Sequence, residues 1–273
     1  EREIAGGRVV LLQRKSCAHV WESGSSSSRP ERPTILFIPG GAFISDFEAA
    51  DLAFLYRWVR ETDALVVYVS YNFAPQSPYP APMLRVFQTY RALREHRHDL
   101  PFVASPLVVS GLSAGGNLAL SALLAPMLQH RAPAEVAEQF AVPPLMPAAI
   151  LLLCPTLNLS RSPSPSRICF ASDVLLPLPF LKAFASAYDQ CTDHVIDPLL
   201  SPVFAADEVL RRLPPTHLQC GGLDPLLDDS VDFNTRIRRV GVPGELTIFR
   251  SLPHTYVSFP HWHAMPEVEA AMA

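Results

Sequence analysis

The run from Pro106 to Leu120 constrains the fold of this chain more than any other segment. It reads Pro-Leu-Val-Val-Ser-Gly-Leu-Ser-Ala-Gly-Gly-Asn-Leu-Ala-Leu, so an apolar stretch ends in Gly111-Leu112-Ser113-Ala114-Gly115 and continues in small residues with helical spacing. A serine on a sharp turn between a strand and a helix has a strained backbone, and the residues two positions away must be nearly free of side chain. Because both of those positions hold glycine, the segment predicts a nucleophile elbow with Ser113 at its tip.

The overall composition excludes several classes of protein. The 273 residues have a formal net charge of −4 and scattered Lys and Arg, so we expect no nucleic-acid partner. The five cysteines form no C-x-x-C pair, which argues against a zinc site or a disulfide framework and favours a reducing, cytoplasmic location. The longest apolar stretch, residues 145–157, contains two prolines and is too short to span a bilayer. We therefore expect no transmembrane segment, while peripheral contact with lipid stays open.

Short apolar runs alternate with longer segments of helical spacing along the chain. This alternation is typical of an α/β fold with a mostly parallel sheet and helices on both faces. We expect a single domain over residues 1–273, with an exposed Ser- and Pro-rich loop at 24–33. The eight expected strands are 8–13, 18–21, 34–38, 65–71, 107–110, 149–154, 216–220 and 246–249, and the expected helices are 48–61, 83–96, 114–129 and 230–240.

The alternation is interrupted at approximately 156–202. A Ser- and Pro-rich loop, 160–166, is followed there by an apolar segment, 174–188. We expect this insertion to form a small lid. The alternative is an ordinary loop followed by a buried core helix, because length alone does not separate the two.

An aspartate and a histidine later in the chain fit the roles of acid and base. A serine hydroxyl needs a histidine base, and a carboxylate must orient that histidine. In enzymes whose nucleophile lies on a strand-to-helix elbow of this kind, the order is serine, acid, histidine, each at the carboxyl end of a strand. Asp224 follows the expected strand 216–220, and His254 follows the expected strand 246–249. The sequence therefore predicts a catalytic triad of Ser113, Asp224 and His254.

Other acids and histidines compete for these roles. Asp228 and Asp229 come four and five residues after the predicted acid, where we expect them to cap a helix in solvent. His217 lies inside an expected strand, and His261 and His263 lie in a Pro-flanked tail. These positions make the competing residues less suitable than Asp224 and His254 for the roles of acid and base.

The segment Pro39-Gly40-Gly41-Ala42-Phe43 follows the expected strand 34–38. Small residues let backbone N–H groups turn inward and approach a substrate closely. We expect the oxyanion hole to consist of the N–H groups of Gly41, Ala42 and Ala114, with a plain Gly-Gly turn as the alternative. A phosphate loop is excluded because the sequence lacks the Gly-Lys-Ser/Thr signature and any G-x-G-x-x-G pattern. Triad chemistry needs no cofactor and no metal, so we expect neither.

Several further blocks follow one another in a fixed order along the chain. They are Pro39-Gly40-Gly41-Ala42-Phe43, the segment Tyr71-Asn72-Phe73-Ala74-Pro75-Gln76-Ser77-Pro78-Tyr79-Pro80, the elbow Ser110-Gly111-Leu112-Ser113-Ala114-Gly115-Gly116-Asn117, and the later segments 197–202, 213–215, 223–230 and 252–254. Together these blocks resemble the hormone-sensitive lipase family of α/β hydrolases, over most of residues 33–259. The resemblance implies the α/β-hydrolase fold and hydrolysis of a small-molecule ester.

Four positions depart from the family pattern. Pro39 replaces a histidine, Gln76 a glutamate, Leu112 an aspartate and Thr255 a glycine. Proline lacks the side-chain donor that histidine would supply to the oxyanion loop. None of the four removes a member of the predicted triad.

We expect a serine carboxylester hydrolase that cleaves hydrophobic acyl esters through an acyl-enzyme on Ser113. The alternative is a non-catalytic, receptor-like protein that binds a small molecule, as the plant gibberellin receptors of this family do without the catalytic histidine. The presence of His254 favours the enzyme. The same triad would also serve amide cleavage.

Overall fold

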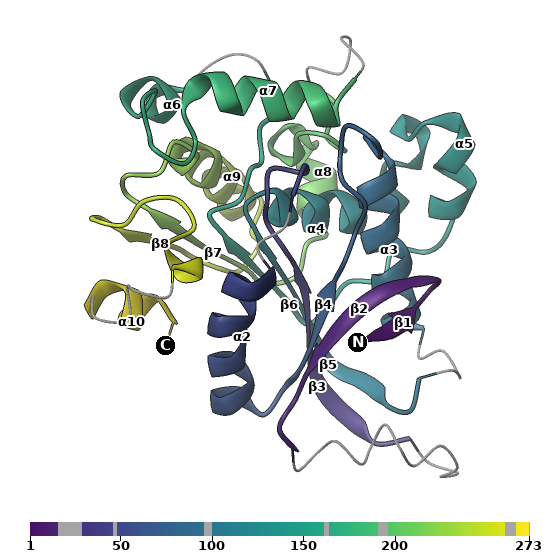
Figure 1. Ribbon diagram of the computed structural model, residues 1–273. Helices are drawn as coiled ribbons and strands as arrows, with labels where there is room; N and C mark the ends of the chain where they lie inside the picture. Colours follow the sequence, from purple (N-terminus) through teal and green to yellow (C-terminus); the bar gives the residue numbers. More distant parts are fainter. Residues whose placement is uncertain are drawn as a thin grey trace.

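A central sheet organises the chain. The computed structural model describes residues 1–15, 29–45, 48–95, 100–160, 164–190, 196–259 and 266–272. Within these ranges the sheet has the strand order β1-β2-β4-β3-β5-β6-β7-β8 (Figure 1). Strands β3 to β8 pair with one another in parallel, and β2 and β1 extend the β4 edge in antiparallel orientation. The strands are β1 Arg2–Ile4, β2 Gly7–Leu12, β3 Glu31–Ile38, β4 Leu65–Val69, β5 Val103–Leu112, β6 Ala149–Leu153, β7 Thr216–Gly221 and β8 Leu246–Phe249.

The mostly parallel, eight-stranded α/β sheet is confirmed, but two strand expectations change. Strand β1 was missed, and the expected strand 18–21 lies outside the described residues. The expected loop 24–33 is wrong at its end, because β3 begins at Glu31. The register between β3 and β5 shifts between Arg32 and Thr34, and such an irregularity accommodates a proline in a paired strand.

Helices follow the predicted spacing with different ends. Helix α4 is shorter than the expected 114–129, because Pro126 has no N–H to continue it. Two 3-10 turns, Ala125–Met127 and Gln129–Arg131, follow instead. The helices are α2 Glu48–Thr62, α3 Ala81–Arg94, α4 Ala114–Leu124, α5 Ala134–Ala137, α6 Pro165–Cys169, α7 Leu178–Tyr188, α8 Asp207–Leu210, α9 Leu227–Arg239 and α10 Pro266–Met272.

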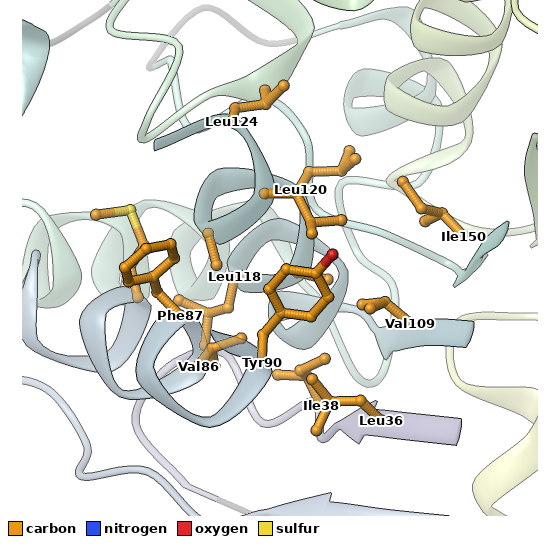
Figure 2. Close-up of a cluster of buried hydrophobic side chains, with 14 of the residues drawn as sticks. Leu36, Ile38, Val86, Phe87, Tyr90, Val109, Leu118, Leu120, Leu124 and Ile150 are labelled. Atoms are coloured by element: carbon orange, nitrogen blue, oxygen red, sulfur yellow. The ribbon is translucent and has the colours of Figure 1, made fainter. Parts of the chain in front are cut away.

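Helices cover both faces of the sheet. Successive side chains of a strand point to opposite faces, so Leu36 and Ile38 of β3 belong to one core cluster and Phe37 to the other. The first cluster is packed mainly against α3, α4 and α9, and the second against α2 and α10. Figure 2 shows strand residues of the first cluster lying against α3 and α4. Among the described residues no helix has the length and apolar character needed to cross a membrane.

Candidate active site

The elbow residue Ser113 lies between the end of β5 and the start of α4. Its φ of 53° and ψ of −118° put a non-glycine residue in the left-handed half of conformational space, which is costly and is found at functional sites. A Cβ on Gly115 would lie 2.1 Å from the carbonyl oxygen of Ile38, and a Cβ on Gly111 would lie 2.4 Å from that of Gly115. The two glycines therefore allow the turn to pack tightly against the neighbouring strand.

The three predicted triad residues lie together. The Nε2 atom of His254 is 2.9 Å from the Oγ of Ser113, and its Nδ1 is 2.8 Å from Oδ2 of Asp224. All three side chains are buried, with exposures of 5% for Ser113, 2% for His254 and 0% for Asp224. The Oδ1 atom of Asp224 accepts the N–H of Leu226 at 2.7 Å, so both carboxylate oxygens have a hydrogen-bond partner.

Close backbone approach brings the acid and the histidine together. A Cβ on Gly221, the last residue of β7, would lie 2.1 Å from the carbonyl oxygen of Leu252. The glycine thus lets the loop that carries His254 pass close to the end of β7. Thr255, the next residue, has a φ of 53° in the left-handed region, where a β-branched residue is strained.

The competing acids have structural contacts instead of a contact with His254. Asp229 was expected to be a solvated cap, and that is wrong: it is 2% exposed and forms an ion pair with Arg167 at 2.9 Å. Its Oδ2 also accepts the N–H groups of Leu157 and Asn158. Burial raises the pKa of Asp229 to about 6, against the opposing effect of Arg167. Asp228 accepts the N–H of Ser166 at 2.7 Å at the start of α6.

The competing histidines lie elsewhere. His217 is exposed on β7, and His261 and His263 lie outside the described residues.

The predicted oxyanion loop forms a tight turn after β3. Gly41, Ala42 and Phe43 have φ values of 108°, 54° and 64°, and the Gly41 carbonyl accepts the N–H of Ser45. Ala114 is the first residue of α4, so its N–H has no carbonyl partner within the helix. All three expected donors therefore belong to backbone that borders Ser113.

Two aromatic contacts hold the loop where the family histidine is missing. The Tyr71 hydroxyl donates to the carbonyl oxygens of Pro39 and Gly40 at 3.1 and 3.2 Å. Phe43 is stacked on Tyr188 of α7, with ring centroids 4.0 Å apart and planes at 6°. This role of Tyr71 was not predicted from the sequence, although Tyr71 begins one of the blocks that resemble the family.

A cavity of about 340 Å³ opens over Ser113 and His254. Its wall is mainly apolar, with three side chains from the expected lid segment. The lining residues are Gly40, Gly41, Ala42, Ser45, Ala50, Asp51, Leu112, Ser113, Leu175, Leu176, Phe180, His254, Thr255, Ser258 and Phe259. This geometry suits an uncharged substrate whose reacting carbonyl lies at the serine.

One side-chain group has donors that a metal accepts. Within the described ranges, ligand atoms of Cys154, Asp224 and His254 lie within 4.8 Å of one another. Thiolate, carboxylate and imidazole are the donors zinc prefers. Here the carboxylate and imidazole are already hydrogen bonded to each other.

Known proteins resemble this chain in sequence and in fold. The profile of a family described by its α/β-hydrolase fold matches residues 35–258. An esterase of Acinetobacter venetianus is 30% identical over 241 residues, which cover 88% of this chain and 72% of the relative. Mouse hormone-sensitive lipase is 29% identical over 165 residues, covering 60% of this chain and 20% of that enzyme. Carboxyl esterase 2 of Tuber melanosporum has the same fold, with a TM-score of 0.78 at 22% identity over 90% of this chain and 75% of that one.

The chain therefore belongs to the α/β-hydrolase-fold family. Within that family it is an esterase- or lipase-type hydrolase, and part of its sequence is similar to hormone-sensitive lipase.

Proposed function

We propose that the chain is a serine carboxylester hydrolase acting on hydrophobic acyl esters, with Ser113 as nucleophile, His254 as base and Asp224 as acid. The observation that carries this proposal is the continuous hydrogen-bonded relay from Asp224 through His254 to Ser113 at the floor of a mainly apolar cavity. Geometry of this kind activates a hydroxyl that is otherwise a weak nucleophile.

The reaction follows from the positions of the atoms. The Oγ of Ser113 attacks the ester carbonyl carbon while His254 Nε2 takes the hydroxyl proton. The N–H groups of Gly41, Ala42 and Ala114 stabilise the resulting oxyanion. His254 then gives its proton to the leaving alcohol, and an acyl-enzyme remains on Ser113.

The second half of the reaction hydrolyses the acyl-enzyme and returns the free enzyme. Water loses a proton to His254 Nε2 and attacks the acyl carbon, and the Ser113 oxygen leaves with that proton. Asp224 keeps Nδ1 protonated throughout and stabilises the imidazolium.

In this proposal the chain forms a single domain, and the segment 156–202 is a lid over the cavity. Leu175, Leu176 and Phe180 of this segment line the cavity, so the lid supplies part of the acyl-binding wall. Such a wall favours acyl groups without charge, because a buried unpaired charge is costly.

The test is labelling with a fluorophosphonate and turnover of p-nitrophenyl esters. Ser113→Ala should abolish both while the thermal unfolding midpoint stays nearly unchanged. Ser77→Ala, at a serine outside the cavity wall, is the matched control and should keep both. Substantial turnover by Ser113→Ala would show that another residue is the nucleophile.

Two alternatives predict different results. A receptor-like protein would bind the ester without turnover, but the histidine such receptors lack is present and lies 2.9 Å from Ser113 Oγ. Amide cleavage would appear as turnover of a p-nitroanilide at a rate comparable to the matching ester.

A further inference from the structure

Two thiols lie close to Asp224, the acid of the proposed triad. Cys154 directly follows β6 and Cys220 lies near the end of β7, and both are completely buried. The N–H of Cys154 donates to the Gln219 carbonyl at 2.7 Å, which continues the pairing of the two strands and places the cysteines side by side. Cys154 has a φ of 46°, so the chain turns sharply there. The two thiols thus form part of the wall against which Asp224 packs.

The Cys220 thiol contacts the reacting side of the carboxylate. Its Sγ donates to Oδ2 of Asp224 at 3.5 Å, a normal length for a sulfur donor, and Oδ2 is the oxygen that accepts from His254 Nδ1. The other oxygen, Oδ1, is held by the N–H of Leu226. Cys220 therefore shares its acceptor atom with the histidine.

The thiol stays protonated in this setting. The hydrogen bond to Cys154, burial, and the negative charge of Asp224 all hold the pKa of Cys220 well above its ordinary value. The S–H is therefore retained at neutral pH, where Cys220 can act as a donor. Its proton partly neutralises Oδ2 and resists rotation of the carboxylate about its Cβ–Cγ bond.

We propose that Cys220 is a positioning residue of the triad, whose thiol donates to Asp224 Oδ2 and sets the orientation and strength of the hydrogen bond between Asp224 and His254. The inference rests on the proposed function. Neither the order of the motifs nor the resemblance to the family assigns a role to this cysteine, and Cys220 is not among the residues that line the cavity.

Removing the thiol has a defined consequence for His254. Without the S–H, Oδ2 has more negative charge facing Nδ1–H, which favours the imidazolium over the neutral imidazole. The acid limb of the pH profile of kcat/KM reports protonation of the essential base in the free enzyme. The limb should therefore move to higher pH, and a looser carboxylate should lower kcat.

The other titratable groups near Asp224 and His254 are the same in the wild type and in the Cys220 variants. They are Cys154 after β6, the Asp229 carboxylate of α9 with its partner Arg167 of α6, the Tyr256 hydroxyl next to the His254 loop, and Asp51 of α2 across the cavity.

The experiment compares Cys220→Ala, Cys220→Ser and the wild type from pH 5 to 9 with p-nitrophenyl butyrate. Cys220→Ala should raise the acid limb by about half a pH unit and lower kcat roughly threefold to tenfold, with little change in KM. Cys220→Ser keeps a donor of similar size, so its limb should lie at or below that of the wild type. Thermal unfolding of each variant separates loss of packing from loss of the donor, since packing alone leaves the limb in place.

Two further variants test whether the effect belongs to Cys220. Cys169→Ala, at an exposed cysteine of α6, should match the wild type. Cys154→Ala should shift the limb less than Cys220→Ala. An unshifted limb in Cys220→Ala, or an equal shift in Cys154→Ala, would overturn the inference. Either result would leave the proposed function intact as long as Ser113→Ala is inactive and unlabelled.

Discussion

At the scale of single residues, surroundings and not residue type separate the acid from its neighbours. Asp224 and Asp229 are both fully buried carboxylates close together in the chain. Asp224 has a histidine within hydrogen-bond distance, whereas Asp229 has an arginine and two backbone amides. A carboxylate whose oxygens already accept from fixed structural donors holds loops together, and one that faces an imidazole can orient it.

The roles of the acids can be tested by a charge change that keeps their shape. Asp224→Asn retains the size of the side chain but loses the charge that stabilises the imidazolium, so turnover should fall by about a thousandfold or more. Asp228→Asn is the matched control, because Asp228 contacts Ser166 at the start of α6 and not His254. Its turnover should stay within a few fold of the wild type. The reverse pattern, measured with the same p-nitrophenyl ester, would assign the acid to Asp228.

At the scale of elements, a buried ion pair connects α6 to α9 and to the loop after β6. Arg167 of α6 donates to both oxygens of Asp229 and to the Asn158 carbonyl. The two partners are 6% and 2% exposed, so their charges are compensated by each other and not by water. This contact fixes the beginning of the segment that contributes to the wall of the cavity.

Breaking that pair should destabilise the fold in a pH-dependent way. Arg167→Leu leaves a buried carboxylate without its counter-charge, a loss of about 3 to 5 kcal/mol in the free energy of unfolding at pH 8. The pKa of Asp229, already raised to about 6, rises further in the variant, so its native state binds a proton that the unfolded chain releases. The destabilisation should therefore be smaller at pH 5 than at pH 8.

Arg57→Leu is the matched control for the ion pair. Arg57 pairs with Glu61 and Glu269 at the surface, where such contacts contribute less than about 1 kcal/mol. Urea unfolding of both variants at the two pH values gives the comparison. Equal effects of the two substitutions would contradict a special role for the buried pair.

At the scale of the whole molecule, the substrate cavity exists only because distant segments meet. The strand ends supply Ser113 and His254, the turn after β3 supplies Gly41 and Ala42, and the segment before α7 supplies Leu176. Phe43 of the turn is stacked on Tyr188 at the end of α7, so the oxyanion loop and the expected lid hold each other. The size of the cavity is therefore a property of the assembled chain.

Filling the cavity from the lid side should change which esters react. Leu176 is 5% exposed and lines the cavity, so Leu176→Trp should lower kcat/KM for octanoyl esters at least tenfold more than for acetyl esters. Val174→Trp, at a residue 94% exposed and outside the cavity wall, is the matched control. An unchanged chain-length profile in Leu176→Trp would remove this segment from the acyl-binding wall.

Features that depend on neighbours in sequence were predictable from the sequence alone. The alternation of short apolar runs with segments of helical spacing predicted the mostly parallel sheet, because the period of the apolar residues distinguishes a buried strand from a helix. The elbow at Ser113 was predictable because such a tight turn requires residues without side chains two positions away, and both positions hold glycine. Chain order then pointed to Asp224 and His254.

Tertiary structure decided whatever depends on which distant groups meet. The sequence gives no sign that Asp229 pairs with Arg167, because that contact joins residues 62 positions apart. Nor does it place the Tyr71 hydroxyl on the oxyanion loop or the Cys220 thiol on Asp224. Strand β1 was missed because three residues contain too little periodicity, and it forms only by pairing with β2. Local sterics and periodicity depend on residues that are neighbours in the sequence. Burial and hydrogen-bond partners depend on residues that meet only when the chain has packed.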